Sequence, residues 1–163
     1  MVRVIYLCLV VIFSFPLLAT AKGIETAKQV EQNLWVMGMP TNADIERFAE
    51  QGGDIVVSLL SVSEQSQTAE STWVTHHGMA FYHIAIPGAE GLTFAKVRLL
   101  DKVLLEHKEK NVLVHCASGN RVGALFALRA AWLDGKDKEV ALKIGRERGL
   151  TSLEKTVSEM IAQ

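Results

Sequence analysis

The chain carries, at residues 112–123, the segment Val-Leu-Val-His-Cys-Ala-Ser-Gly-Asn-Arg-Val-Gly. Its first three residues are apolar, two of them the β-branched valines 112 and 114, and predict a strand. The apolar residues Val122, Leu125 and Phe126 have helical spacing, so a helix is expected to begin where the segment ends. The residues between strand and helix, from Cys116 to Arg121, then form a loop at a helix N-terminus.

A loop in this position has the chemistry of an anion-binding nucleophile site. Inward-facing backbone N–H groups and the positive end of the helix dipole hold an oxyanion and favour the thiolate form of Cys116. Arg121 adds a planar fork of donors that matches two oxygens of a phosphate or sulfur oxyanion. We expect Gly119 to turn the loop with a positive φ. The predicted anion-binding residues are Ala117, Ser118, Gly119, Asn120 and Arg121. The alternative is that Cys116 is only a small buried apolar residue.

The first 21 residues have the composition of a secretory signal peptide. Arg3 precedes an uncharged stretch that ends in Ala19-Thr20-Ala21, small residues that are typical of a cleavage site. We expect cleavage between Ala21 and Lys22, and a periplasmic or secreted protein with no stable membrane anchor. An uncleaved anchor is the alternative, because the uncharged stretch is long.

The cysteine content and the net charge indicate a reactive thiol and argue against nucleic acid as a partner. Cys8 lies in the predicted signal peptide, so the exported chain would keep Cys116 alone and could form no internal disulfide. A lone thiol in an oxidising compartment points to reactivity, and to a possible reductant as partner. The exported chain loses one of 17 basic residues and keeps all 18 acidic ones, for a net charge of −2. Nucleic acid is therefore not an expected partner.

Strands are expected at 33–37, 54–60, 80–86 and 112–115. Helices are expected at 41–51, in part of 63–78, at 93–107, from the Cys116 loop to about 133, at 136–148, and after a capping box of Thr151 and Glu154. Strands that alternate with helices predict an α/β fold with a mostly parallel central sheet flanked by helices. Ligands bind beyond the carboxyl ends of such strands, where the Cys116 loop falls. The histidines show no metal-ligand spacing, so we expect no metal and no cofactor.

The pattern His-Cys-x-x-Gly-x-Arg at 115–121, together with segments 34–40 and 82–87, resembles the phosphatase-like domain of beta-lactamase hydrolase-like proteins. That domain is similar in fold to tyrosine and dual-specificity phosphatases, so the resemblance implies a domain of this type over residues 22–163. It implies that Cys116 attacks phosphorus to form a phosphocysteine and that Arg121 holds the phosphoryl oxygens. The implied substrate is a phosphorylated small molecule or phosphoprotein.

The chain departs from the tyrosine phosphatase pattern in three places. Four residues separate Cys116 from Arg121, where ordinary tyrosine phosphatases have five. Val122 replaces the hydroxyl residue that usually follows the arginine and helps the thiolate to leave. No aspartate follows the segment 84–87, and the acid available there is Glu90, the candidate general acid.

These departures leave three functions open. The first is an exported cysteine-dependent phosphatase. The second is a rhodanese-like sulfurtransferase, which also has four residues in this interval and would carry a persulfide on Cys116. The third is a binding module that keeps the anion-binding loop without turnover; binding alone does not require Cys116.

Overall fold

The computed structural model describes residues 27–162, so the predicted signal peptide and its cleavage site lie outside the described residues. Five short strands form one sheet in the order β1-β2-β5-β3-β4. Their bounds are β1 Lys28–Glu31, β2 Leu34–Met37, β3 Ile55–Ser58, β4 Ala80–His83 and β5 Val112–His115. The pairs β2–β5, β5–β3 and β3–β4 are parallel, and β1 pairs with β2 in the antiparallel sense. The predicted mostly parallel sheet is confirmed.

Strand β1 was not expected from the sequence. Its residues Lys-Gln-Val-Glu are mostly exposed and polar, so they lack the apolar run that marks a buried strand. It lies at one edge of the sheet and closes a tight antiparallel pair with β2.

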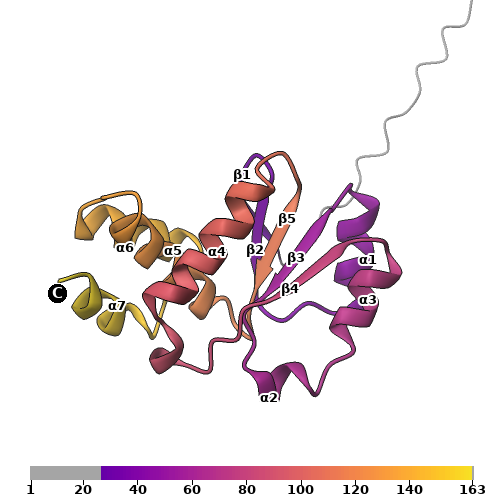
Figure 1. The fold of residues 1–163 in the computed structure, drawn as a ribbon, viewed down its shortest axis with the longest axis horizontal. Helices are drawn as coiled ribbons and strands as arrows, with labels where there is room; N and C mark the ends of the chain where they lie inside the picture. Colours follow the sequence, from indigo (N-terminus) through magenta and orange to yellow (C-terminus); the bar gives the residue numbers. More distant parts are fainter. Residues whose placement is uncertain (1–26, 163) are drawn as a thin grey trace, which may run out of the picture.

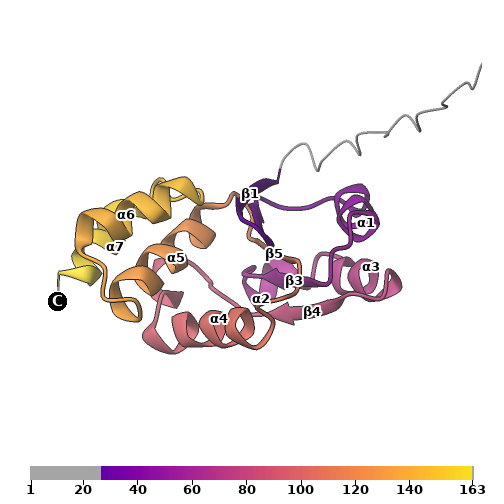
Figure 2. The ribbon, with the colours of Figure 1, turned by 90° about the horizontal axis from the view of Figure 1, so that it is seen from above.

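Helices cover both faces of the sheet. Helices α1 and α3 lie on one side, and α4 to α7 lie on the other (Figures 1 and 2). The short helix α2 lies beyond the carboxyl ends of the strands (Figure 1). The helix bounds are α1 Asn42–Glu50, α2 Val62–Gln65, α3 Glu70–His76, α4 Phe94–Glu106, α5 Asn120–Trp132, α6 Lys138–Glu147 and α7 Glu154–Ile161.

The two faces of the sheet bury separate cores, as the alternation of side chains along a strand requires. Val112 and Val114 of β5 pack with α4 to α7, whereas Leu113, between them, packs with Ile45 and Phe48 of α1. His115 therefore shares the face of Leu113, toward α1 and α3. This alternation places the side chain of His115, the residue before Cys116, on the side of the sheet that α1 and α3 cover.

Two predicted strands are shorter than expected. Strands were predicted to continue to Leu60 and Ile86, but β3 ends at Ser58 and β4 at His83. The backbone carbonyls beyond these points accept hydrogen bonds from side chains: Arg121 binds those of Leu59 and Ile86, and His83 contacts that of Leu60. The backbone carbonyls just beyond the carboxyl ends of β3 and β4 thus hold the side chain of Arg121 in place.

Of the two capping boxes predicted from the sequence, one is present in the structure. Thr41 and Asp44 form the expected capping box of α1. The box predicted at Thr151 and Glu154 is wrong, because the N-cap of α7 is Leu153 and it has no side-chain cap. The Thr151 N–H is taken instead by Asn120 Oδ1 at 2.8 Å. Between residues 27 and 162 the structure contains no helix both long and apolar enough to cross a membrane.

Candidate active site

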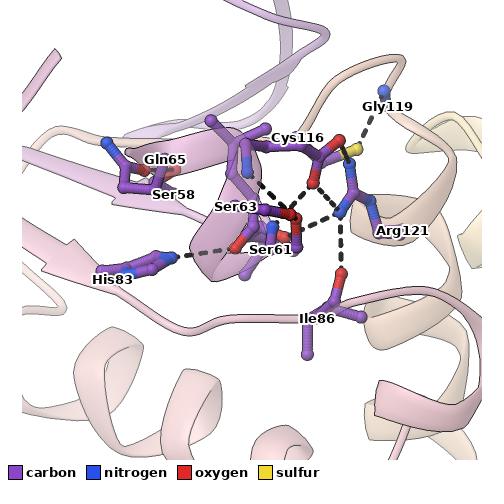
Figure 3. A network of polar contacts seen from close by, with 12 residues as sticks. Ser58, Ser61, Ser63, Gln65, His83, Ile86, Cys116, Gly119 and Arg121 are labelled. Carbon is purple, nitrogen blue, oxygen red and sulfur yellow. Dashed lines mark hydrogen bonds and ion pairs between the residues drawn. The ribbon is translucent and has the colours of Figure 1, made fainter. Parts of the chain in front are cut away.

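The Cys116 loop runs from β5 into α5, as predicted. Gly119 is the N-cap residue of α5 and has φ 87°, in the left-handed region that favours glycine. Its N–H donates a hydrogen bond to Cys116 Sγ at 3.1 Å (Figure 3). Cys116 is fully buried, so the sulfur lies inside the loop at the start of the helix.

The other residues of the Cys116 loop differ in their exposure and in their hydrogen-bond partners. Ala117 and Ser118 are exposed, and the Ala117 carbonyl accepts a hydrogen bond from the Met39 N–H at 3.1 Å. The Asn120 side chain bonds to Ser152 and to the Thr151 N–H, so it holds the loop that precedes α7. Its contribution to the predicted anion site is therefore its position at the first turn of α5 rather than its amide group.

Arg121 is held by acceptors from three segments. Its Nη1 and Nη2 atoms donate to the two carboxylate oxygens of Glu64 at 2.7 and 2.8 Å. Nη1 also donates to the carbonyls of Ile86 at 2.7 Å and Leu59 at 3.3 Å (Figure 3). The side chain is 12% exposed. Arg121 thus has a fixed orientation at the carboxyl ends of the strands.

These contacts use one edge of the guanidinium group. A guanidinium has five N–H donors. Among the described residues, the Nε N–H and the second N–H of Nη2 donate to no protein oxygen. The hydrogen bonds to Glu64 raise the pKa of Arg121, burial lowers it, and the charge of Cys116 and a hydrogen bond with its side chain raise it further. The Nε–Nη2 edge, which has no oxygen partner among the described residues, is suited to two oxygens of an oxyanion.

Glu64 is a site residue that the sequence reading missed. It lies on α2, where Ser61 forms a capping box with it, and the Ser61 N–H donates to Glu64 Oε2 at 2.7 Å. The hydrogen bonds from Arg121 hold the pKa of Glu64 at about 2, against an ordinary 4.5. The available signal was the Ser-x-x-Glu pattern at 61–64, directly after a buried strand.

His115 meets a second acid that the sequence did not reveal. Its Nε2 atom lies 2.5 Å from Glu70 Oε1, and the two side chains are 0% and 1% exposed. Gln65 joins this pair to β3, because its Nε2 donates to Glu70 Oε2 at 3.4 Å. The Oε1 atom of Gln65 accepts from the Ser58 hydroxyl at 2.8 Å (Figure 3). Two neighbouring residues of α2 are thus connected to the Cys116 loop. Glu64 binds Arg121 directly, and Gln65 contacts Glu70, which in turn contacts His115.

Glu90 lies on the 3-10 turn Ala89–Gly91 that follows β4, and it is exposed. Among residues 27–162 it makes no hydrogen bond or ion pair. The segment before it is anchored to the site, because the Ile86 carbonyl accepts from Arg121. Gly91 packs closely against Ile86. A Cβ atom added to Gly91 would lie 3.1 Å from the Cα atom of Ile86. Glu90 is therefore the free side chain of a tightly folded loop.

The described residues offer no alternative centre for a metal. No three His, Cys, Asp or Glu side chains between residues 27 and 162 are grouped so that they could hold an ion. The buried thiol of Cys116, the start of α5 and Arg121 together form an arrangement that is suited to binding an anion beside the sulfur.

Comparison with known proteins supports the predicted resemblance. No protein-family model matches the chain. Two curated proteins, both named beta-lactamase hydrolase-like protein, from Xylella fastidiosa strains Temecula1 and 9a5c, are 26% identical over 113 residues. The match covers 67% of this chain and 26% of each relative. The chain therefore spans about a quarter of the length of the curated relatives it matches.

Solved structures share the fold. A protein of Shewanella putrefaciens CN-32, named "Putative phosphatase (DUF442)", has a TM-score of 0.66 and 20% identity over 87% of this chain and 94% of that one. Tk-PTP in its active form has a TM-score of 0.63 and 22% identity, with 84% and 96% covered. TpbA of P. aeruginosa, in complex with pTyr, has a TM-score of 0.58 and 18% identity, with 85% and 91% covered. The predicted phosphatase-like fold is confirmed.

Proposed function

We propose that this chain is an exported cysteine-dependent phosphatase that hydrolyses phosphate monoesters through a phosphocysteine. The observation that carries the proposal is the position of Cys116 Sγ, which accepts the Gly119 N–H at the start of α5 and interacts with the guanidinium group of Arg121. Phosphatases among the structural neighbours support the same reaction, and TpbA in complex with pTyr favours an aryl phosphate as the first substrate to test.

In the first step, the Cys116 thiolate attacks phosphorus and the bond between phosphorus and the ester oxygen breaks. Backbone N–H groups at the start of α5 and the Nε–Nη2 edge of Arg121 stabilise the charge on the phosphoryl oxygens. The departing oxygen takes a proton from Glu90, the free acid of the adjoining loop. The products are a phosphocysteine and an alcohol or phenol.

In the second step, water attacks the phosphocysteine, Glu90 accepts the proton, and inorganic phosphate and the Cys116 thiolate are released. Val122, fully buried, has no hydroxyl to assist the departing sulfur. We therefore expect the second step to be slow, so that an aryl phosphate gives a burst of phenol before steady turnover.

The burst also supplies the test. Rapid mixing with an aryl phosphate should release about one equivalent of phenol per active site, and acid quenching should leave phosphate on Cys116. Cys116→Ser should abolish the burst and the steady rate. A steady rate without a burst would refute slow breakdown, and phosphate release by Cys116→Ser would refute the cysteine mechanism.

The sulfurtransferase is the second candidate, and the four-residue interval between Cys116 and Arg121 in the sequence supports it. In that reaction the Cys116 thiolate takes a sulfur atom from thiosulfate, which leaves as sulfite, and the resulting persulfide passes the sulfur to cyanide. Glu90 has no role in this cycle. Thiocyanate formation that does not change in Glu90→Gln, with no phosphate release, would select this candidate.

Export is part of the proposal and rests on residues 1–21 alone. Their single basic residue, uncharged stretch and Ala-Thr-Ala ending are those of a cleaved signal. Expression of the whole chain in a Gram-negative host, followed by fractionation and N-terminal sequencing, tests it. A mature protein that begins at Lys22 in the periplasm is expected, and an intact N-terminus in the membrane fraction would contradict it.

A further inference from the structure

The α6–α7 turn, residues 149–153, lies directly against the backbone of the Cys116 loop, and the proposed reaction gives it no role. Gly149 has φ 101°, and a Cβ atom there would lie 2.9 Å from the carbonyl oxygen of Gly119 and 3.1 Å from its carbonyl carbon. A side chain of any size would therefore push Gly119 away. Glycine at this position allows the two backbones to touch.

Hydrogen bonds join the same turn to the next residue of the loop. Asn120 Oδ1 accepts the N–H of Thr151 at 2.8 Å and that of Leu153 at 3.4 Å. Asn120 Nδ2 donates to Ser152 Oγ at 2.7 Å. The α6–α7 turn is therefore bonded to Asn120 as well as packed on Gly119.

The α6–α7 turn has little room to shift relative to α5. Helices α5 and α6 lie side by side (Figures 1 and 2). A Cβ atom at Gly123 would lie 2.5 Å from the Gly145 carbonyl oxygen and would overlap the backbone nitrogen of Leu150. Leu150 is itself buried in the core on this side of the sheet. Because the packing is this close, an added atom at Gly149 displaces the loop rather than the turn.

Gly119 has no side chain by which its neighbours could hold it, so backbone contacts set its orientation. The atoms nearest to the position of its missing Cβ are the Met37 carbonyl oxygen at 3.8 Å and the Gly149 Cα at 3.9 Å. The same residue donates its N–H to Cys116 Sγ at 3.1 Å. Gly119 therefore connects the α6–α7 turn to the sulfur.

We propose that Gly149 is a positioning residue that, through its contact with Gly119, keeps the Gly119 N–H directed at Cys116 Sγ. The α6–α7 turn then sets both the reactivity of the thiol and the affinity of the loop for an anion. An N–H group that faces the sulfur favours the thiolate over the thiol. The inference rests on the proposed function only in taking Cys116 as the nucleophile.

Two measurements that need no turnover test the proposal on the purified full chain. The first is the rate at which iodoacetamide alkylates Cys116 at neutral pH, followed by mass spectrometry of the Cys116 peptide. The second is the concentration of inorganic phosphate that halves this rate. Gly149→Ala should slow alkylation about tenfold and raise the protecting phosphate concentration, because a hydrogen bond to a charged group is worth about this factor.

Gly135→Ala is the matched control. Gly135 follows the other end of α5 and also has a positive φ, 63°. Apart from its chain neighbours, no described atom lies within 4 Å of the position of a Cβ there. The control therefore has the same kind of backbone strain without the contact, and its alkylation rate should equal that of the wild type. Equal slowing in both variants, or an unchanged rate in folded Gly149→Ala, would overturn the proposal.

Ser152→Ala covers the case in which Gly149→Ala does not fold. It removes the hydroxyl that accepts from Asn120, and it should slow alkylation about threefold, the scale of one neutral hydrogen bond. An unchanged rate in Ser152→Ala would then overturn the proposal. Failure of the phosphatase reaction is separate, because alkylation needs no phosphate ester. Slowed alkylation in these variants of a protein without turnover would refute only the proposed function.

Discussion

Glu64 binds the guanidinium group of Arg121 through both of its carboxylate oxygens, at 2.7 and 2.8 Å. The two residues are 57 positions apart, on α2 and at the start of α5. The contact fixes the guanidinium plane and leaves the Nε–Nη2 edge without an oxygen partner among the described residues. It also makes the position of Arg121 depend on a helix of only four residues.

Glu64→Gln should lower kcat/KM for an aryl phosphate by about 100-fold, because a clamp that is misplaced by about 1 Å loses this much. The amide can accept from only one guanidinium nitrogen, so Arg121 would tilt. Steady-state kinetics check the value, with Glu46→Gln as the control. Faster turnover in Glu64→Gln would instead show that Glu64 competes with the substrate for Arg121.

The same contact should make stability depend on pH in acid. The pKa of Glu64 is about 2 in the folded protein against 4.5 ordinarily, so its contribution is complete above pH 4.5 and is lost as the pH falls toward 2. Glu64 is 36% exposed, so solvent screens the pair and we expect a modest effect. Urea unfolding of wild type and Glu64→Gln should give a difference that is constant near neutral pH and shrinks through this window. A difference independent of pH would contradict it.

Glu90→Gln should separate substrates by their leaving groups. A proton donor matters most when the departing oxygen is a poor leaving group, so alkyl phosphates should lose about 100-fold and activated aryl phosphates much less. Kinetics on a series of phosphate esters would show a steeper dependence on leaving-group acidity. Glu139, another exposed acid, provides the control substitution. Equal losses for all esters would exclude Glu90 as the general acid.

Asn120→Ala should destabilise the protein rather than remove an anion ligand. The Asn120 Oδ1 atom accepts the Thr151 N–H at 2.8 Å, and the amide nitrogen donates to Ser152 at 2.7 Å. Loss of these bonds should cost about 1 kcal/mol, because solvent can replace part of them. Chemical unfolding measures the cost. A large rise in KM with unchanged stability would show instead that the side chain binds substrate.

The local sequence was enough to predict the Cys116 loop. It was not enough to predict Glu64 and Glu70, the acids that contact Arg121 and His115. The strand, Cys116, Gly119 and the start of α5 are contiguous, so periodicity and glycine chemistry predicted their arrangement. Glu64 and Glu70 reach the loop only through tertiary packing, because Arg121 and His115 are far along the chain from them. Strand β1 was missed because its edge position tolerates polar residues. Thr151 was taken for a cap because no local signal shows that Asn120 binds its N–H.

The central claim is that Cys116 turns over phosphate monoesters, and phosphate release by the purified protein tests it most directly. An aryl phosphate and thiosulfate with cyanide are assayed in parallel, with Cys116→Ser as the control for both. The account predicts phosphate release that Cys116→Ser abolishes, and no thiocyanate. Thiocyanate without phosphate, or neither product, would contradict it.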